Sequence, residues 1–143
     1  MTALTNDRNT PQLAGDHLVG ALAAATTVYA GALVMRNAAG FLLSGATAAG
    51  SVGVGRAEEQ VDNSTGSNGD KTIMVRPGVF RFANSAAADL IAQSEIGDVC
   101  YIVDDQTVAK TDGTASRSPA GIIHDIDDNG VWVRLDEALT KAS

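Results

Sequence analysis

The clearest fold signal lies in residues 122–135, which read Ile-Ile-His-Asp-Ile-Asp-Asp-Asn-Gly-Val-Trp-Val-Arg-Leu. Alternating apolar and polar residues flank Asn129-Gly130, which favours a two-residue β-hairpin because both central residues of a type I′ turn need positive φ. In that register Asp125 lies opposite Arg134, and the two side chains share a face and form an ion pair. We therefore expect the apolar residues to gather on the other face, together with one histidine: Ile122, His124, Ile126, Val131, Val133 and Leu135.

The polar face of the predicted hairpin carries Trp132, the only tryptophan of the chain. Tryptophan is enriched in binding hot spots, so Trp132 and its neighbour Arg134 are candidate contacts to a partner. Partial cover by a neighbouring loop explains Trp132 equally well. His124 is expected to be a hydrogen-bonded core residue rather than a ligand or a base.

Outward from this hairpin, short apolar runs separated by Gly, Pro, Asn and Asp predict about nine short strands. They include residues 51–57, 72–75 and 79–82. One short helix is expected over Ala86–Gln93, with Asn84 or Ser85 as its N-cap. The sequence thus predicts a mainly β domain, a β-sandwich or jelly roll with one short helix, over residues 17–143.

Residues 1–16 are polar and have no helical or strand period. We expect them to form an extended N-terminal arm that becomes ordered on a partner. The arm also has no apolar core of the kind found in a secretory signal.

Composition excludes several classes of function. The 143 residues hold 17 acidic and 10 basic side chains, a net charge of −7, with no basic tract. Nucleic-acid binding needs clustered Lys and Arg, so neither a nucleic acid nor an anionic membrane is an expected partner. The single cysteine, Cys100, forms no internal disulfide, fits a reducing compartment and is expected to be buried and inert.

A 38-residue span, Leu18–Gly55, contains only one charged side chain, Arg36. Its many glycines and alanines give too little transfer energy for a membrane span. We expect small-residue β-strands that pack closely against another copy of the chain or another protein.

One pattern matches the first half of a calcium loop, Asp125-x-Asp127-x-Asn129-Gly130, with Asp136 at the twelfth position. A calcium loop closes with a bidentate Glu and lies between helices, whereas both flanks here alternate as strands do, which favours an acidic hairpin turn. We therefore predict no metal, no cofactor and no catalytic residue. A calcium-dependent carbohydrate-binding β-module, using this loop and Trp132, is the alternative function, and an enzyme based on scattered Asp residues and two histidines is third.

Five segments in order resemble the capsid cement, or head decoration, proteins of tailed bacteriophages: LTNDRNTP (4–11), VYAGALV (28–34), GVFRFANS (78–85), IGDVCYIVDDQTVAKT (96–111) and AGIIHDIDDNGVWVRL (120–135). The resemblance implies a non-enzymatic virion protein, made in the host cytoplasm, that binds the outside of a shell of major capsid protein and reinforces it. It implies contacts to the shell from Leu4, Asn9, Thr10 and Pro11. It also implies that the chain assembles with other copies of itself, as a dimer or trimer.

Overall fold

The computed structural model describes residues 2–13 and 15–143, and this part of the chain is mainly β. It contains twelve strands, two single 3₁₀ turns, η1 (Ala87–Asp89) and η2 (Gln93–Glu95), and one α-helix, α1 (Glu137–Ala142). The strands are β1 (Leu18–Ala21), β2 (Thr26–Val28), β3 (Leu33–Arg36), β4 (Leu42–Ser44), β5 (Val52–Ala57), β6 (Val61–Asn63), β7 (Thr72–Arg76), β8 (Gly78–Phe82), β9 (Val99–Ile102), β10 (Val108–Ala109), β11 (Pro119–Asp127) and β12 (Gly130–Leu135).

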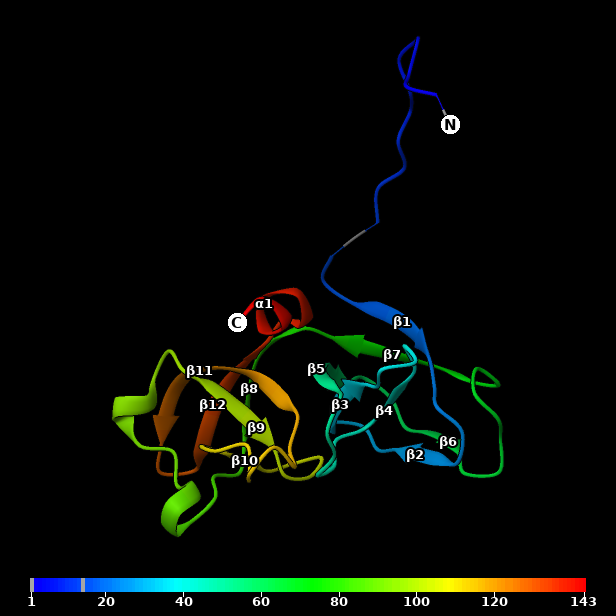
Figure 1. The fold of residues 1–143 in the computed structure, drawn as a ribbon. Coiled ribbons are helices and arrows are strands. Elements are labelled where there is room, and N and C mark those ends of the chain that lie inside the picture. The colour runs from blue at the N-terminus through cyan, green and yellow to red at the C-terminus, as the bar shows by residue number, and fades with distance from the viewer. Residues whose placement is uncertain (1, 14) are drawn as a thin grey trace.

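The strands form three antiparallel sheets. The first sheet has the order β1-β7-β5-β3-β4, the second β10-β9-β11-β12-β8, and a small third sheet pairs β2 with β6. The second sheet lies on the left in Figure 1 and the other two on the right, with α1 above the junction. A mainly β fold with one α-helix is therefore confirmed for the described residues.

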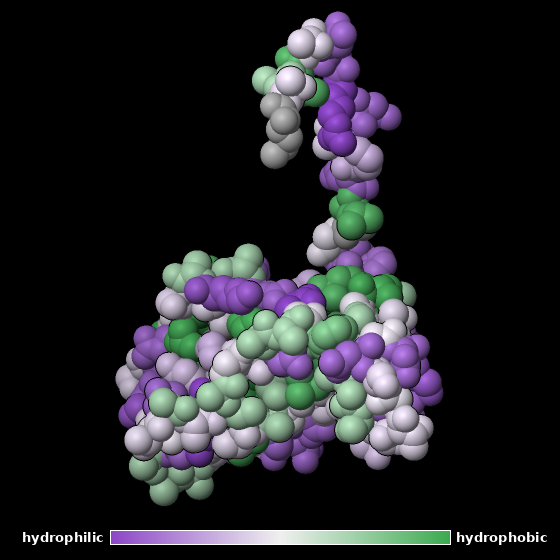
Figure 2. Space-filling view, turned by 45° about the vertical axis from the view of Figure 1, so that its right-hand side comes forward, coloured by the Kyte–Doolittle hydropathy of each residue, from purple (hydrophilic) through white to green (hydrophobic). Residues whose placement is uncertain are grey.

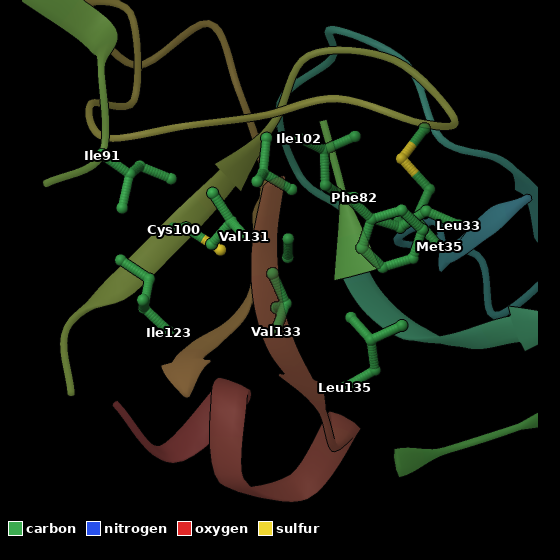
Figure 3. Close-up of a cluster of buried hydrophobic side chains, with 12 residues drawn as sticks. Leu33, Met35, Phe82, Ile91, Cys100, Ile102, Ile123, Val131, Val133 and Leu135 are labelled. Atoms are coloured by element: carbon green, nitrogen blue, oxygen red, sulfur yellow. The ribbon is translucent and has the colours of Figure 1, made fainter. Parts of the chain in front are cut away.

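The first sheet is buried on both faces at its centre. Leu33 and Met35 of β3 join a core formed mainly by the second sheet, and Figure 3 shows them beside Phe82 and Leu135. Val34 points the opposite way, into a second core. This is the period of two that a strand with two covered faces requires.

Glycine in β5 allows the first and second sheets to approach each other. A Cβ atom at Gly53 would collide with the backbone carbonyl oxygen of Ala120 in β11. The small residues of the charge-poor span therefore serve packing inside the chain, and its large apolar side chains, such as Leu22, Met35 and Leu42, are buried there. Val19 and Tyr29 of the same span stay exposed, so cover of these two by another molecule remains a prediction. Within the described residues, no helix is long and apolar enough to cross a membrane.

The predicted hairpin forms, but its register differs. The turn consists of Asp128 and Asn129, with Asp127 paired to Gly130, and neither turn residue has positive φ. The Asp127 side chain accepts a hydrogen bond from the Asn129 backbone N–H at 2.7 Å, a local bond that stabilises the turn one residue earlier than predicted. Gly130 is needed next to β8, because a Cβ atom there would meet the Phe82 carbonyl oxygen.

A β-bulge at His124 adds a second shift. Beyond it Ile123 is buried opposite Val133, whereas His124 is exposed. The prediction that His124 is a core residue is therefore wrong. Arg134 lies opposite Ile122 rather than Asp125, and the predicted ion pair is not formed. Val131, Val133 and Leu135 are buried as predicted, because their alternation along β12 does not depend on the turn.

The helix expected over Ala86–Gln93 is wrong. This segment is a loop containing η1 and the first residue of η2, and the Asn84 side chain holds it. Asn84 Oδ1 accepts from the Ile91 N–H, and its Nδ2 donates to the Ile91 carbonyl, both at 2.9 Å. The only α-helix in the described chain is α1, whose N-cap Asp136 accepts from the Leu139 N–H at 3.0 Å.

Asn84→Ala is expected to lower the free energy of unfolding by about 2 kcal/mol, because it leaves the N–H and C=O of the buried Ile91 without partners. Urea denaturation measures the change. Asn9→Ala, in the exposed arm, is the matched control and is expected to leave stability unchanged. Equal stabilities of the two variants would contradict the role given to Asn84.

Candidate interaction surface

The N-terminal arm stands away from the rest of the molecule (Figure 1). Residues 2–13 are all exposed and contain no helix or strand. Their hydrogen bonds are local: the Arg8 guanidinium donates to Thr10 Oγ1 at 2.9 Å, and the Thr10 N–H donates to the Arg8 carbonyl at 3.1 Å. Four exposed arm residues, Leu4, Asn9, Thr10 and Pro11, are thus free to contact another molecule.

Apolar side chains gather where the arm joins β1, and we call this surface the arm foot: Leu13, Leu18, Val19, Met74 and Pro77. Leu13 is 93% exposed and Val19 60% exposed. Val19 is paired with Met74 of β7, so both side chains lie on one face. Leu13, Leu18, Val19 and Pro77 border a groove of about 610 Å³, and Figure 2 shows apolar surface at the base of the arm.

The arm foot also holds a free sheet edge. β1 is the outermost strand of the first sheet and pairs only with β7. Proteins usually protect such an edge with a charge, a proline or a bulge, and the four residues of β1 offer none of these. At the end of β1 the next residue, Leu22, bridges Leu42 of β4, which closes that end of the edge. The Leu18 end is open to an added strand from another chain, through main-chain hydrogen bonds.

Arg134, a candidate contact, lies near the arm foot. It is exposed on β12, opposite Val79 of β8, and makes no ion pair within the described residues. Arg134 and Pro77 border one hollow, and Pro77 also borders the groove of the arm foot. The structure thus places Arg134 and the arm foot on one continuous surface.

Trp132, the other candidate on β12, points to the same side as Arg134, two residues away. Its indole N–H donates to Asp127 Oδ2 at 2.8 Å. The Arg81 guanidinium lies 5.5 Å from the centre of its ring, and Arg81 and Asp127 approach to 4.0 Å. Much of Trp132 is thus engaged by its own chain, which leaves Arg134 as the freer of the two.

Net charge is divided unevenly over the molecule. Residues 83–130 contain nine acidic and two basic side chains and so account for all of the −7, whereas the remaining residues hold eight of each sign. The arm and the arm foot belong to the balanced part. The loops of the second sheet carry the negative charge.

The acidic hairpin turn does not have the form of a calcium loop. Both oxygens of Asp127 accept hydrogen bonds from the chain, from Asn129 and from Trp132. Asp136 caps α1 instead of facing the turn. In the described ranges, 2–13 and 15–143, no three His, Cys, Asp or Glu side chains are grouped to hold a metal ion, and Cys100 is buried, which raises the pKa of its thiol to about 12.

Acid titration is expected to report the contact between Trp132 and Asp127. The indole hydrogen bond, followed by that from Asn129, lowers the pKa of Asp127 below its ordinary value of 3.8. A lowered folded-state pKa stabilises the fold above the ordinary value, and this contribution is lost as pH falls through the folded pKa. Trp132 fluorescence followed between pH 7 and pH 2 is expected to change below pH 3.8, and Asp127→Asn should remove that step; a step retained in Asp127→Asn would contradict the assignment.

The sequence patterns predicted the exposed arm but not the apolar surface where the arm joins β1. Leu13 carries one usable signal, because it is, with Leu4, one of two leucines in a mostly polar arm. Val19 and Met74 give no sequence signal of their exposure, since buried strands contain the same residue types. Their exposure follows from the edge position of β1, which only the sheet order reveals.

Comparison with protein-family models, curated proteins and solved structures found no match to this chain.

Proposed function

We propose that this chain is a structural virion protein that binds the outer surface of a tailed-phage capsid and cements neighbouring major capsid protein subunits. The observation that carries the proposal is the exposed arm, which continues into an apolar surface at the edge strand β1. The two five-stranded sheets would then correspond to the sandwich or jelly-roll-like domain that the resemblance implies.

The reach of the arm suits a protein that joins subunits. Twelve residues, 2–13, span about 40 Å when fully extended. The arm can therefore contact one subunit while the arm foot rests on its neighbour. A link of this kind resists separation of the two subunits.

The distribution of charge suits the same orientation. The arm and the arm foot come from the part of the sequence whose charges balance, whereas residues 83–130 hold the net −7. Modest contacts at each copy suffice, because many linked copies on a symmetric shell bind with high avidity. Association with other copies of the chain, as a dimer or trimer, is part of this proposal.

The test uses undecorated, expanded capsids of the tailed phage whose genome encodes the chain. Purified protein at micromolar concentration is mixed with the capsids, and bound protein is quantified after sedimentation. We expect saturation at a fixed ratio to the major capsid protein and greater resistance of the decorated capsids to heat. Absence of binding with the arm intact would overturn the proposal.

A further inference from the structure

The open edge of β1 has main-chain groups whose direction follows from the pairing with β7. The Leu22 N–H donates to the Lys71 carbonyl at 2.9 Å, on the β7 side. Backbone groups along an antiparallel strand point to alternate sides, so those of Leu18 and Gly20 also face β7. The N–H and carbonyl of Val19 therefore face the open edge, where β1 has no neighbouring strand.

The arm of the same chain can reach this edge. The chain bends at Gly15 and Asp16, just before β1 begins. A two-residue hairpin loop with glycine in its first position favours a type II′ turn, whose twist matches that of the flanking strands. Gly15-Asp16 has this order, so residues that precede it can run back along β1.

We propose that residues 11–13 fold back onto β1 as an additional edge strand, with Gly15-Asp16 as the turn. In this register Gln12 lies opposite Val19. Counted outward from a two-residue turn, this pair is one that exchanges hydrogen bonds. The pairing of β1 with β7 requires the same of Val19, so two independent constraints give one register.

The neighbouring pairs suit the fold-back as well. Leu13, which is 93% exposed in the open arm, lies opposite Leu18, which packs against the second core. Pro11 lies opposite Gly20, at a position where its missing N–H would face away from β1 and no donor is needed. A proline on the outer side also hinders the addition of a further strand. The fold-back thus replaces an unprotected edge with a protected one.

The open arm in Figure 1 and the folded-back arm are two states of one chain. Closure breaks no contact with the domain, because the hydrogen bonds of residues 2–13 are local. A strand of three residues gains few hydrogen bonds and must order the arm, so closure adds little to the stability of the domain. A partner can therefore displace it. Given the proposed function, closure withholds the arm and the edge of β1 until the capsid binds them.

Disulfide trapping in the full chain, without capsids, tests the fold-back. Gln12→Cys combined with Val19→Cys creates a pair with Cα atoms about 5.5 Å apart in the closed state, a distance that suits a disulfide. Both positions are exposed, and the buried Cys100 does not compete. Leu13→Cys combined with Val19→Cys is the matched control, because neighbouring strand residues point to opposite faces.

In a glutathione redox buffer, we expect the first variant to form its intramolecular disulfide about tenfold more readily than the control variant. Equal oxidation of the two variants would overturn the proposed register. A disulfide that joins two chains would also overturn the proposal, because the arm would then pair with a second copy.

The first variant also tests the role of closure on the capsid, which rests on the proposed function. Its oxidised form, with the arm held closed, is expected to bind undecorated capsids at least about tenfold more weakly than its reduced form. Equal binding by the two forms would overturn this role. Absence of binding by the wild type would overturn the proposed function instead, whereas the fold-back is decided by the disulfide alone.

Discussion

Gly53→Ala is expected to lower the free energy of unfolding by about 3 kcal/mol or more, because the new methyl group has no room. A Cβ atom at this position would overlap the backbone carbonyl of Ala120, and a backbone atom cannot move aside as a side chain can. The two sheets must then separate where β5 crosses β11. Urea or thermal denaturation measures the loss.

Gly15→Ala is the matched control, because a Cβ atom there meets nothing within 4 Å. This variant is expected to be as stable as the wild type. If Gly53→Ala proved equally stable, the first and second sheets would not be in backbone contact at this position.

Removal of residues 1–16 is expected to abolish capsid decoration while the remaining domain stays folded. Residues 2–13 are exposed and make no hydrogen bond to the rest of the chain. Its removal is therefore expected to change the stability of the domain little, but it takes away the longest element of the proposed interface. Circular dichroism and thermal denaturation check the fold, and capsid sedimentation checks binding; unfolding of the shortened chain would show that the arm belongs to the core.

Polar substitution of the arm foot separates its role from that of the arm. Val19→Ser combined with Met74→Ser is expected to weaken decoration by about tenfold, because burial of these exposed side chains drives docking. Leu90→Ser combined with Ile96→Ser changes two exposed apolar residues in the acidic part of the chain and should leave binding unchanged. If only the Leu90→Ser and Ile96→Ser variant bound more weakly, the contact would lie on the acidic part of the chain, which would contradict the role given to the arm foot.

The sequence predicted those parts of the fold that alternation alone determines. β5, β7 and β8 lie where apolar runs between turn residues placed them, and β12 buries Val131, Val133 and Leu135 as its alternation requires. The register of β11 could not be predicted in this way. It depends on a bulge at His124 and on the fit of Gly130 against Phe82, which are contacts between strands far apart in sequence.

Local sequence preference also predicted a helix over Ala86–Gln93 that does not form. Asn84 and Ser85 followed by three alanines resemble a capped helix, yet the Asn84 side chain bonds to Ile91 and holds an open loop instead. Of the candidate contacts, the polar arm and Arg134 were found from residue patterns, and both lie at one surface in the structure. Val19 and Met74 were missed because exposure of a strand residue depends on its place in the sheet.

Electron microscopy of capsids decorated with the full chain tests the central proposal most directly. We predict density for the chain on the outer surface of the shell, with the arm along the boundary between major capsid protein subunits and the arm foot in contact with one of them. The acidic loops of residues 83–130 should face solvent. Capsids that remain bare, or that bind the chain through these acidic loops with the arm free, would contradict it.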